Sequence, residues 1–180
     1  MSNHSWFLEY KKKPNATIRL FCFHHSGGGA SAYRPWVEHL SPHIEMISIQ
    51  LPGRENRFIE PLNNNLKDIT TQLREGFHFY KDKPFFVFGH SLGGLLSFEF
   101  IKSIYQHYTV YPRHMIVSAT KAPHFPFRMK HLSRLDDKTL KEELKVYSGI
   151  DERILNNDEF LDLFLPIIKN DFSISESYLC

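Results

Sequence analysis

The sequence predicts an α/β fold in which helices cover a mostly parallel sheet, and two patterns along the chain support this class. Four apolar runs rich in strand-favouring residues stand at 18–23, 45–51, 85–89 and 114–118. Their apolar residues are continuous rather than alternating, as in strands that are buried on both faces of a parallel sheet. Stretches with helical periodicity separate the runs, and such alternation of strand and helix is typical of α/β proteins.

Three helical stretches fill the gaps between the four strands. The first two are predicted at 33–40 and 66–80. The third, at 92–107, places its apolar residues at helical spacing and so has one apolar stripe that can pack on the sheet. The residues of that stripe are Leu95, Leu96, Phe100, Ile101 and Ile104.

The chain changes character after the fourth strand. Residues 121–130 form an irregular run that contains prolines, and two amphipathic helices are predicted after it, at about 137–147 and 158–170. Gly149 is a suitable stop for the first of these helices. Pro166 is expected to bend or divide the second. Two successive helices inserted after a strand are typical of a lid over a substrate channel.

Length and composition favour one domain, over residues 1–180, with the lid insertion at about 121–172. The formal charge is only +2 and the one dense basic run is 11–13, so no nucleic-acid partner is expected. The two cysteines are too few for a disulfide framework. No secretory signal and no run of about 18 apolar residues is present, which favours the cytoplasm and no membrane association.

The most informative motif is Gly-His-Ser-Leu-Gly at 89–93, which directly follows an apolar strand and opens a helix. This context is typical of a nucleophile elbow, in which a sharp turn exposes the serine hydroxyl at the edge of the sheet. Ser91 is therefore the predicted catalytic nucleophile. Gly89 and Gly93 are expected to support the elbow, because strand and helix approach closely there. His90 is expected to belong to this support rather than to act as a base, since its side chain should point away from its neighbour's hydroxyl.

A glycine-rich loop at 24–29 follows the first central strand, where serine hydrolases of this kind place half of their oxyanion hole. The predicted donors are the backbone amides of Ser26 or Gly27, together with that of Leu92. A phosphate-binding loop is a poorer interpretation, because no Lys-Ser/Thr pair follows and the spacing is not that of a dinucleotide fingerprint. His24 and its neighbour could ligate a metal or act as a displaced base. No clustered carboxylate or cysteine accompanies them, so no metal is predicted.

The loop at 50–57, with Glu60 and Pro61 after it, gathers two arginines and acidic residues behind the second strand. Alone, this segment is typical of a turn with a surface salt bridge, which contributes little to stability.

Taken together, several segments of the chain resemble the type II thioesterases, the stand-alone editing enzymes of the α/β-hydrolase superfamily. The most specific segment is Leu-Pro-Gly-Arg-Glu at 51–55, because Gly-His-Ser-x-Gly alone is shared by many hydrolases. The resemblance covers about residues 17–179. The other segments that carry it lie at 20–28, 57–61, 89–94, 117–124 and 165–172, with Tyr178.

The resemblance implies a function in secondary-metabolite biosynthesis. Type II thioesterases hydrolyse acyl groups from the phosphopantetheine arm of carrier proteins in nonribosomal peptide and polyketide synthases. By this resemblance Ser91 would accept the acyl group, and the helices after Asp136 would form the lid. The implied partner is an acyl or peptidyl carrier protein with its acyl-thioester, and no cofactor of the enzyme's own is implied.

The acid and the base of a catalytic triad are missing from the expected order. In α/β-hydrolases an acid and then a histidine follow the nucleophile, but the only carboxylate between Ser91 and His131, the last histidine, is Glu99. Glu99 should lie about 12 Å along the helix axis from the serine. We therefore expect a C-terminally truncated domain without its last strands, an open apolar edge at 114–118, and little activity of this chain.

Two alternatives to a thioesterase remain open at this stage. The chain could be a non-catalytic truncated remnant or a module that binds carrier proteins without cleaving the thioester. It could also be a general serine esterase, because the elbow is common to both kinds of hydrolase. In the related enzymes a proline usually stands where this chain has His24.

Overall fold

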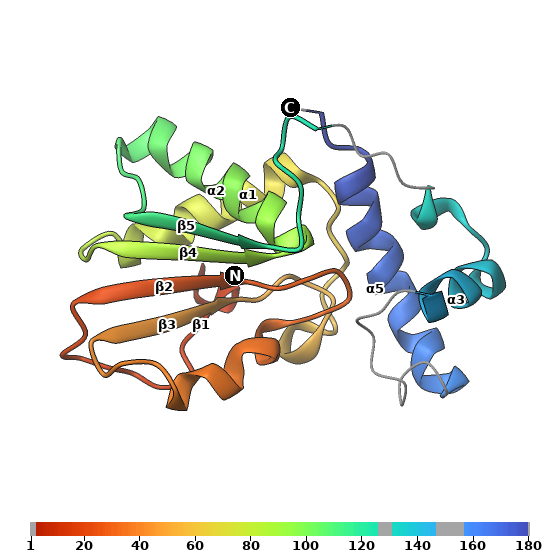
Figure 1. Cartoon of the computed structure of the whole chain (residues 1–180), viewed down its shortest axis with the longest axis horizontal. Helices are drawn as coiled ribbons and strands as arrows, with labels where there is room; N and C mark the ends of the chain where they lie inside the picture. Colours follow the sequence, from red (N-terminus) through yellow and green to blue (C-terminus); the bar gives the residue numbers. More distant parts are fainter. Residues whose placement is uncertain (1–2, 126–130, 147–156, 180) are drawn as a thin grey trace.

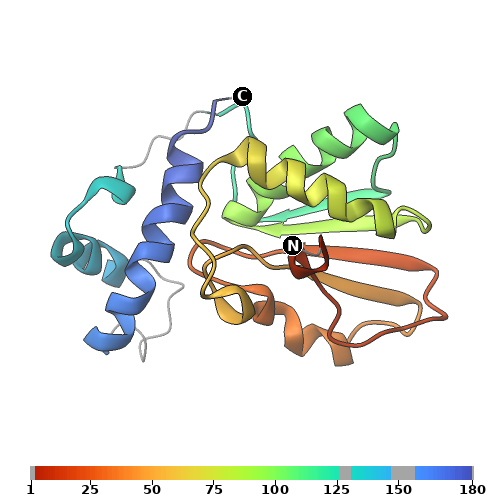
Figure 2. The ribbon, with the colours of Figure 1, turned by 180° about the vertical axis from the view of Figure 1, so that it is seen from behind.

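The computed structural model describes residues 3–125, 131–146 and 157–179 (Figures 1 and 2). Its centre is a five-stranded sheet with the order β1-β3-β2-β4-β5. Strands β2 to β5 pair in parallel, and β1 pairs antiparallel with β3. The strands are β1 Phe7–Leu8, β2 Ile18–Phe23, β3 Ile44–Ile49, β4 Phe85–His90 and β5 His114–Ser118. The predicted α/β class with a mostly parallel sheet is confirmed.

Helices cover both faces of this sheet (Figures 1 and 2). Helices α1 (Leu66–Phe77) and α2 (Leu92–Tyr108) lie on one face. The 3₁₀ helix Ala30–Glu38 lies on the other, where Tyr33 and Val37 pack into a small apolar cluster. The side chain of Asn65 caps α1 by accepting a hydrogen bond from the backbone of its first turn.

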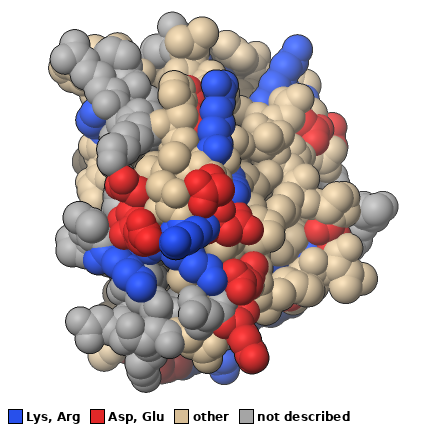
Figure 3. Space-filling model, turned by 90° about the vertical axis from the view of Figure 1, so that its right-hand side faces the viewer, with Lys and Arg blue, Asp and Glu red and all other residues tan. Residues whose placement is uncertain are grey.

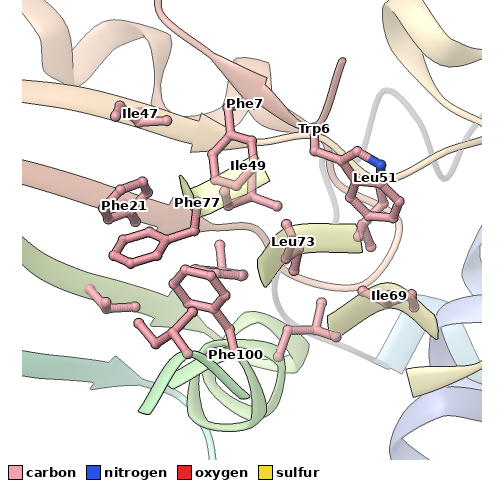
Figure 4. Packing of buried hydrophobic residues seen from close by; sticks show 14 of the residues in the cluster. Trp6, Phe7, Phe21, Ile47, Ile49, Leu51, Ile69, Leu73, Phe77 and Phe100 are labelled. Atoms are coloured by element: carbon pink, nitrogen blue, oxygen red, sulfur yellow. The ribbon is translucent and has the colours of Figure 1, made fainter. Parts of the chain in front are cut away.

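The main apolar core lies between the sheet and the helices α1 and α2 (Figure 4). Phe21 is completely buried at its centre, and its ring lies 5.7 Å from Phe77, 5.6 Å from Phe85 and 6.1 Å from Phe100, between centroids. Tilted and edge-on aromatic contacts of this kind stabilise a core beyond simple area burial. The core therefore holds β2 and β4 rigidly beneath the loops at their carboxyl ends.

The four predicted strands are all present, but the sheet differs from the prediction in two ways. The short strand β1 was not predicted, because two residues give no periodic pattern. Strand β5 was expected to be buried on both faces, yet Ile116 is 47% and Val117 51% exposed. Within the described residues β5 pairs only with β4 and forms the edge of the sheet, so the expected open apolar edge is confirmed.

The predicted helices are present with changed ends. The helix expected at 33–40 is the 3₁₀ segment Ala30–Glu38, which contains Pro35. The helix expected at 66–80 ends at Phe77, and a 3₁₀ turn, His78–Tyr80, follows it. The third helix extends one residue beyond the expected range, to Tyr108.

After the irregular residues 119–125, the described chain beyond β5 forms helical segments and no strand, as predicted. It forms the 3₁₀ turn Leu132–Arg134, α3 (Asp137–Val146) and α5 (Asp158–Glu176). Pro166 was expected to bend or divide this helix, and it does not divide it: the buried residues on both sides of this exposed proline hold α5 together as one helix. Residues 126–130 of the irregular run, Tyr147 and the predicted stop at Gly149 lie outside the described residues.

Helices α3 and α5 lie at the end of the sheet toward which the parallel strands point (Figure 1). A second apolar cluster joins them, and it consists of Leu132, Leu140, Leu144, Leu161, Leu165 and Ile168. Helix α5 runs beyond its predicted end because Ile174 packs into the main core. It therefore touches both cores and crosses the carboxyl ends of the strands. None of the helices in the described ranges has the length and hydropathy needed to cross a bilayer.

Candidate active site

Ser91 occupies the turn between β4 and α2 in a conformation that non-glycine residues rarely adopt. Its φ is 54° and its ψ is −119°. The Ser91 amide donates to the Ser118 carbonyl over 2.8 Å, and the Gly94 amide donates to the Ser91 carbonyl over 2.9 Å. Backbone strain of this kind costs about 1–3 kcal/mol and persists where the surroundings enforce it, often at active sites. The turn has the backbone of the predicted elbow.

Close backbone contacts explain the two glycines of the elbow. A Cβ on Gly89 would lie 2.3 Å from the Gly93 carbonyl oxygen. A Cβ on Gly93 would lie 2.1 Å from the carbonyl oxygen of Phe23 in β2. Real Cβ atoms are not found at such distances, so only glycine allows β2, β4 and α2 to approach this closely.

No catalytic base reaches Ser91 within the described ranges. The ring nitrogen Nδ1 of His90 lies 3.0 Å from the Ser118 hydroxyl, and the His25 and His90 rings pack edge to face, 5.8 Å apart. None of the described histidines hydrogen-bonds to the Ser91 hydroxyl. Glu99 is engaged elsewhere, since it accepts hydrogen bonds from the Tyr178 hydroxyl (2.6 Å) and from a lysine.

A cavity of about 480 Å³ opens beside Ser91. Its walls come from the elbow and the start of α2, from the loop that follows β5, from the end of α5 and from Tyr178 after it. They are formed by Ser91, Leu92, Leu95, Ala119, Thr120, Lys121, Ala122, Pro123, Phe125, Ser175 and Tyr178. Most of these side chains are apolar, so the cavity suits an apolar acyl chain attached near the serine hydroxyl.

The structure distinguishes between the two predicted donors of the glycine-rich loop, because the backbone amide of one of them is already hydrogen-bonded. The Gly27 amide donates to Asp171 Oδ2 in α5 over 2.8 Å, so it does not point at a reacting carbonyl, and this part of the prediction needs correction. The Ser26 amide has no hydrogen-bond partner within the described residues, and Ser26 is partly exposed. The Leu92 amide lies at the first residue of α2, where amides lack intrahelical partners. Ser26 and Leu92 therefore remain as the candidate pair.

Asp171 is the acceptor in a buried ion pair that the sequence did not predict. The guanidinium of Arg54 donates to both of its carboxylate oxygens, over 2.7 and 2.8 Å. The side chain of Arg54 is 3% exposed and that of Asp171 is fully buried. Arg54 also donates to the Gly28 carbonyl over 3.1 Å. One signal was present in the sequence: Asp171 falls three residues after Ile168, on the apolar face of its helix.

Two further side chains from the segment after β3 hold the other end of the glycine-rich loop. The Gln50 side chain accepts a hydrogen bond from the Ala30 amide over 2.8 Å. The Glu55 carboxylate accepts from the Ser31 amide over 3.2 Å and from its hydroxyl over 2.5 Å. The Leu-Pro-Gly-Arg-Glu segment is thus the support on which the candidate oxyanion loop is built.

The alternative interpretation of this segment, a turn with a surface salt bridge, is wrong for both of its arginines. Arg57 is 5% exposed and binds Glu60 through two hydrogen bonds of 2.9 and 2.6 Å. Its guanidinium also lies 4.3 Å from the centroid of the Trp6 ring. Buried cations of this kind must be paired, and each of the two arginines has its own carboxylate.

His24 is a buried neutral side chain rather than a metal ligand or base. Its Nδ1–H donates to the His25 carbonyl over 2.8 Å, and its Nε2 has no hydrogen-bond partner among the described residues. Burial, followed by the positive charge of Arg54, lowers the pKa of His24 to about 4. Among the described residues, no group of three or more His, Cys, Asp or Glu side chains is arranged to hold a metal ion.

The low pKa of His24 predicts a loss of stability in acid. The unfolded chain binds a proton near pH 6.5, whereas the folded chain binds it only near pH 4. The free energy of unfolding should therefore decrease as the pH is lowered from 6.5 to 4, by about 3 kcal/mol in total from this residue. Urea unfolding at pH 7 and pH 4.5 measures the effect. Burial also lowers the pKa of His25, so the contribution is read from the difference between the unaltered chain and His24→Asn. An equal pH dependence of both proteins would contradict the prediction.

Comparison with known proteins gives consistent matches. Residues 18–180 match the family model described as thioesterase domain. Linear gramicidin dehydrogenase LgrE of Brevibacillus parabrevis is 36% identical over 99% of this chain and 69% of its own length. Thioesterase PikA5 of Streptomyces venezuelae is 35% identical over 97% of this chain and 62% of its own. The solved structure of the type II thioesterase BorB from the borrelidin biosynthetic cluster superposes with a TM-score of 0.86, at 28% identity over 97% of this chain and 71% of that one. The chain thus spans about two thirds of the length of these relatives.

Proposed function

Since the chain belongs to the thioesterase domain family and has type II thioesterases with the α/β-hydrolase fold as its structural neighbours, we propose that it transfers acyl groups from thioesters to Ser91 and then to water. The substrate would be an acyl group on the phosphopantetheine arm of a carrier protein that belongs to a nonribosomal peptide or polyketide synthase. The observation that carries the proposal is the strained Ser91 turn at the wall of an apolar cavity beneath α5.

In the proposed reaction each of these groups has a role. The Ser91 oxygen attacks the thioester carbonyl, and the amides of Leu92 and Ser26 donate to the oxygen on which negative charge develops. The carbon–sulfur bond then breaks, the thiol leaves with a proton, and water later hydrolyses the acyl-serine. A general base has to carry the serine proton in the first step. Because the described residues supply none, this chain on its own should turn over slowly.

The name of LgrE denotes a dehydrogenase, and this activity is not carried over to the present chain. Its glycine-rich loop lacks the spacing of a dinucleotide fingerprint. The loop is also held by side chains, because Arg54 and Asp171 occupy its Gly27 and Gly28 backbone groups. The observed loop supports acyl transfer better than nucleotide binding.

The face that carries α3 and α5 gives no specific support to a role as a carrier-binding module. Acidic and basic side chains are intermixed there (Figure 3). Two ion pairs link the helices, Lys141 with Asp162 at 2.8 Å and Lys169 with Asp137 at 2.5 Å. An acidic carrier protein would therefore meet a mixed surface on this face rather than a single basic patch.

Acylation of Ser91 tests the proposal. The purified chain is incubated with hexanoyl-pantetheine, with a hexanoyl carrier protein and with a matched hexanoyl oxygen ester, and the protein is analysed by mass spectrometry. We expect slow transfer of a single hexanoyl group to Ser91 from the two thioesters, and less from the oxygen ester. Steady-state hydrolysis should stay low, because the described residues place no base beside Ser91 and the loss of a triad member leaves at most about 10³ to 10⁴-fold over the uncatalysed reaction.

Two serine variants complete this experiment. Ser91→Ala should abolish the adduct, whereas Ser175→Ala, which removes another hydroxyl of the same cavity, should retain it. Faster reaction of the oxygen ester would favour a general esterase. Binding of the carrier protein without any adduct on Ser91 would contradict the proposal and favour a non-catalytic module. Rapid steady-state hydrolysis that depends on Ser91 would show that a base is present after all.

A further inference from the structure

Helix α5 contacts the candidate oxyanion loop directly. Gly27 has a φ of +74°, and a Cβ there would lie 2.9 Å from Cγ1 of Ile168, one turn before Asp171 on α5. The Asp171 carboxylate accepts the Gly27 amide over 2.8 Å. One face of α5 therefore both covers Gly27 and binds its backbone.

The charge of Asp171 is balanced within the same contact. Arg54 binds both carboxylate oxygens and also the Gly28 carbonyl. Two successive residues of the loop are thus held by the two partners of a single buried ion pair. Asp171 holds Gly27, and Arg54 holds Gly28. Because charge-assisted hydrogen bonds are shorter and stronger than neutral ones, this arrangement restricts the loop more than apolar packing would.

We propose that Asp171 is a positioning residue, which acts through the Gly27 amide to orient the preceding peptide so that the Ser26 amide faces the oxyanion site. The inference rests on the proposed function of Ser91. The amide of Ser26 lies one residue before the bound amide. Only the φ and ψ angles of Ser26 separate the two peptide planes, and a change in these angles would turn its N–H away from the site. Asp171 itself does not touch the reacting atoms.

The proposal makes α5 part of the oxyanion machinery and not only a cover. A displacement of α5 that withdraws Asp171 would release Gly27 and leave Arg54 without its carboxylate. Closure of α5 over the cavity and assembly of the oxyanion site would therefore be one event.

A pair of inhibitors separates positioning from general damage. Hexylboronic acid forms a bond from the Ser91 oxygen to boron, the hydroxyl proton passes to water, and a hydroxyl oxygen of the resulting anionic tetrahedral boronate occupies the oxyanion site. Hexan-1-ol fills the same cavity without forming this bond. We expect Asp171→Asn to weaken hexylboronic acid binding by at least about 10-fold, less than the loss of a whole oxyanion donor. Binding of hexan-1-ol should stay unchanged.

Two control variants match this change in position and chemistry. Asp137→Asn removes an ion pair between α3 and α5, and Arg57→Gln removes the other buried arginine of the same loop. Both should leave the ratio of boronic acid to alcohol affinity as it is in the unaltered chain. An unchanged ratio in Asp171→Asn, or an equal change in Arg57→Gln, would overturn the positioning role. If the Ser91→Ala variant bound hexylboronic acid as tightly as the unaltered chain does, that result would instead contradict the proposed function of Ser91. The assignment of the glycine-rich loop as an oxyanion site would then fail with it.

Hydrogen exchange on the unaltered chain tests the contact even where the Asp171 variant fails to fold. The Gly27 amide should exchange slowly, because it is bound to a buried carboxylate. The Ser26 amide should exchange quickly, since it is partly exposed and unbound within the described residues. Exchange of Gly27 as fast as that of Ser26 would overturn the proposal.

Discussion

Replacement of Gly93 by alanine is expected to destabilise the whole fold. The new Cβ would lie 2.1 Å from the Phe23 carbonyl oxygen and 2.8 Å from that of His24. These are backbone atoms of the central strand β2 and the residue after it, so they cannot rotate away. Overpacking of a core usually costs about 1–3 kcal/mol, and we expect the upper end of this range or more. Urea unfolding followed by circular dichroism measures the loss.

The next residue of the same helix provides the control for this prediction. A Cβ on Gly94 would lie 2.4 Å from the Thr120 methyl group, which belongs to an exposed side chain in the loop after β5. That group can move, so Gly94→Ala should cost much less. Similar losses of stability in both variants would show that helix α2 is not held against β2 as tightly as the contacts indicate.

Removal of either partner of the Arg54–Asp171 pair is the second change with a large expected effect. Each side chain is almost completely buried, so the remaining charge would have no compensation. Breaking a buried pair in this way costs about 3–5 kcal/mol. We expect losses of this size for Arg54→Met and for Asp171→Leu, measured by urea unfolding at pH 7.

The double variant Arg54→Met with Asp171→Leu isolates the interaction between the two residues. Its loss of stability should be well below the sum of the single losses, because no charge is left buried. Some loss should remain, since the Gly27 amide and the Gly28 carbonyl lose their partners at about 1–3 kcal/mol for each unsatisfied group. Strictly additive losses would mean that the two charges do not depend on each other.

Much of the fold was predictable because its signals are local. The apolar runs of β2 and β4 and the stripe of α2 appear directly in the sequence. The exposure of β5 was not predicted from its pattern, because an apolar run does not show how many neighbours a strand has. The sequence also left open whether Pro166 bends or divides α5, since the contacts that hold both sides of this proline come from other parts of the chain.

The candidate site, like the fold, was predictable from the sequence only in part. The motif around Ser91 predicted the elbow and its glycines, because a strand, a tight turn and a helix follow one another within ten residues. It did not distinguish between Ser26 and Gly27 as oxyanion donors. That choice depends on Asp171, which lies 144 residues after Gly27 in the chain.

The sequence by itself therefore determined the class of the fold, the place of Ser91 and the composition of its turn, since each depends on the order of neighbouring residues. Only the tertiary structure decided which amides of the loop remain free and which charges become buried. The Arg54–Asp171 pair shows the physical reason: its partners stand 117 residues apart, and folding alone brings both carboxylate oxygens within hydrogen-bonding distance of the guanidinium.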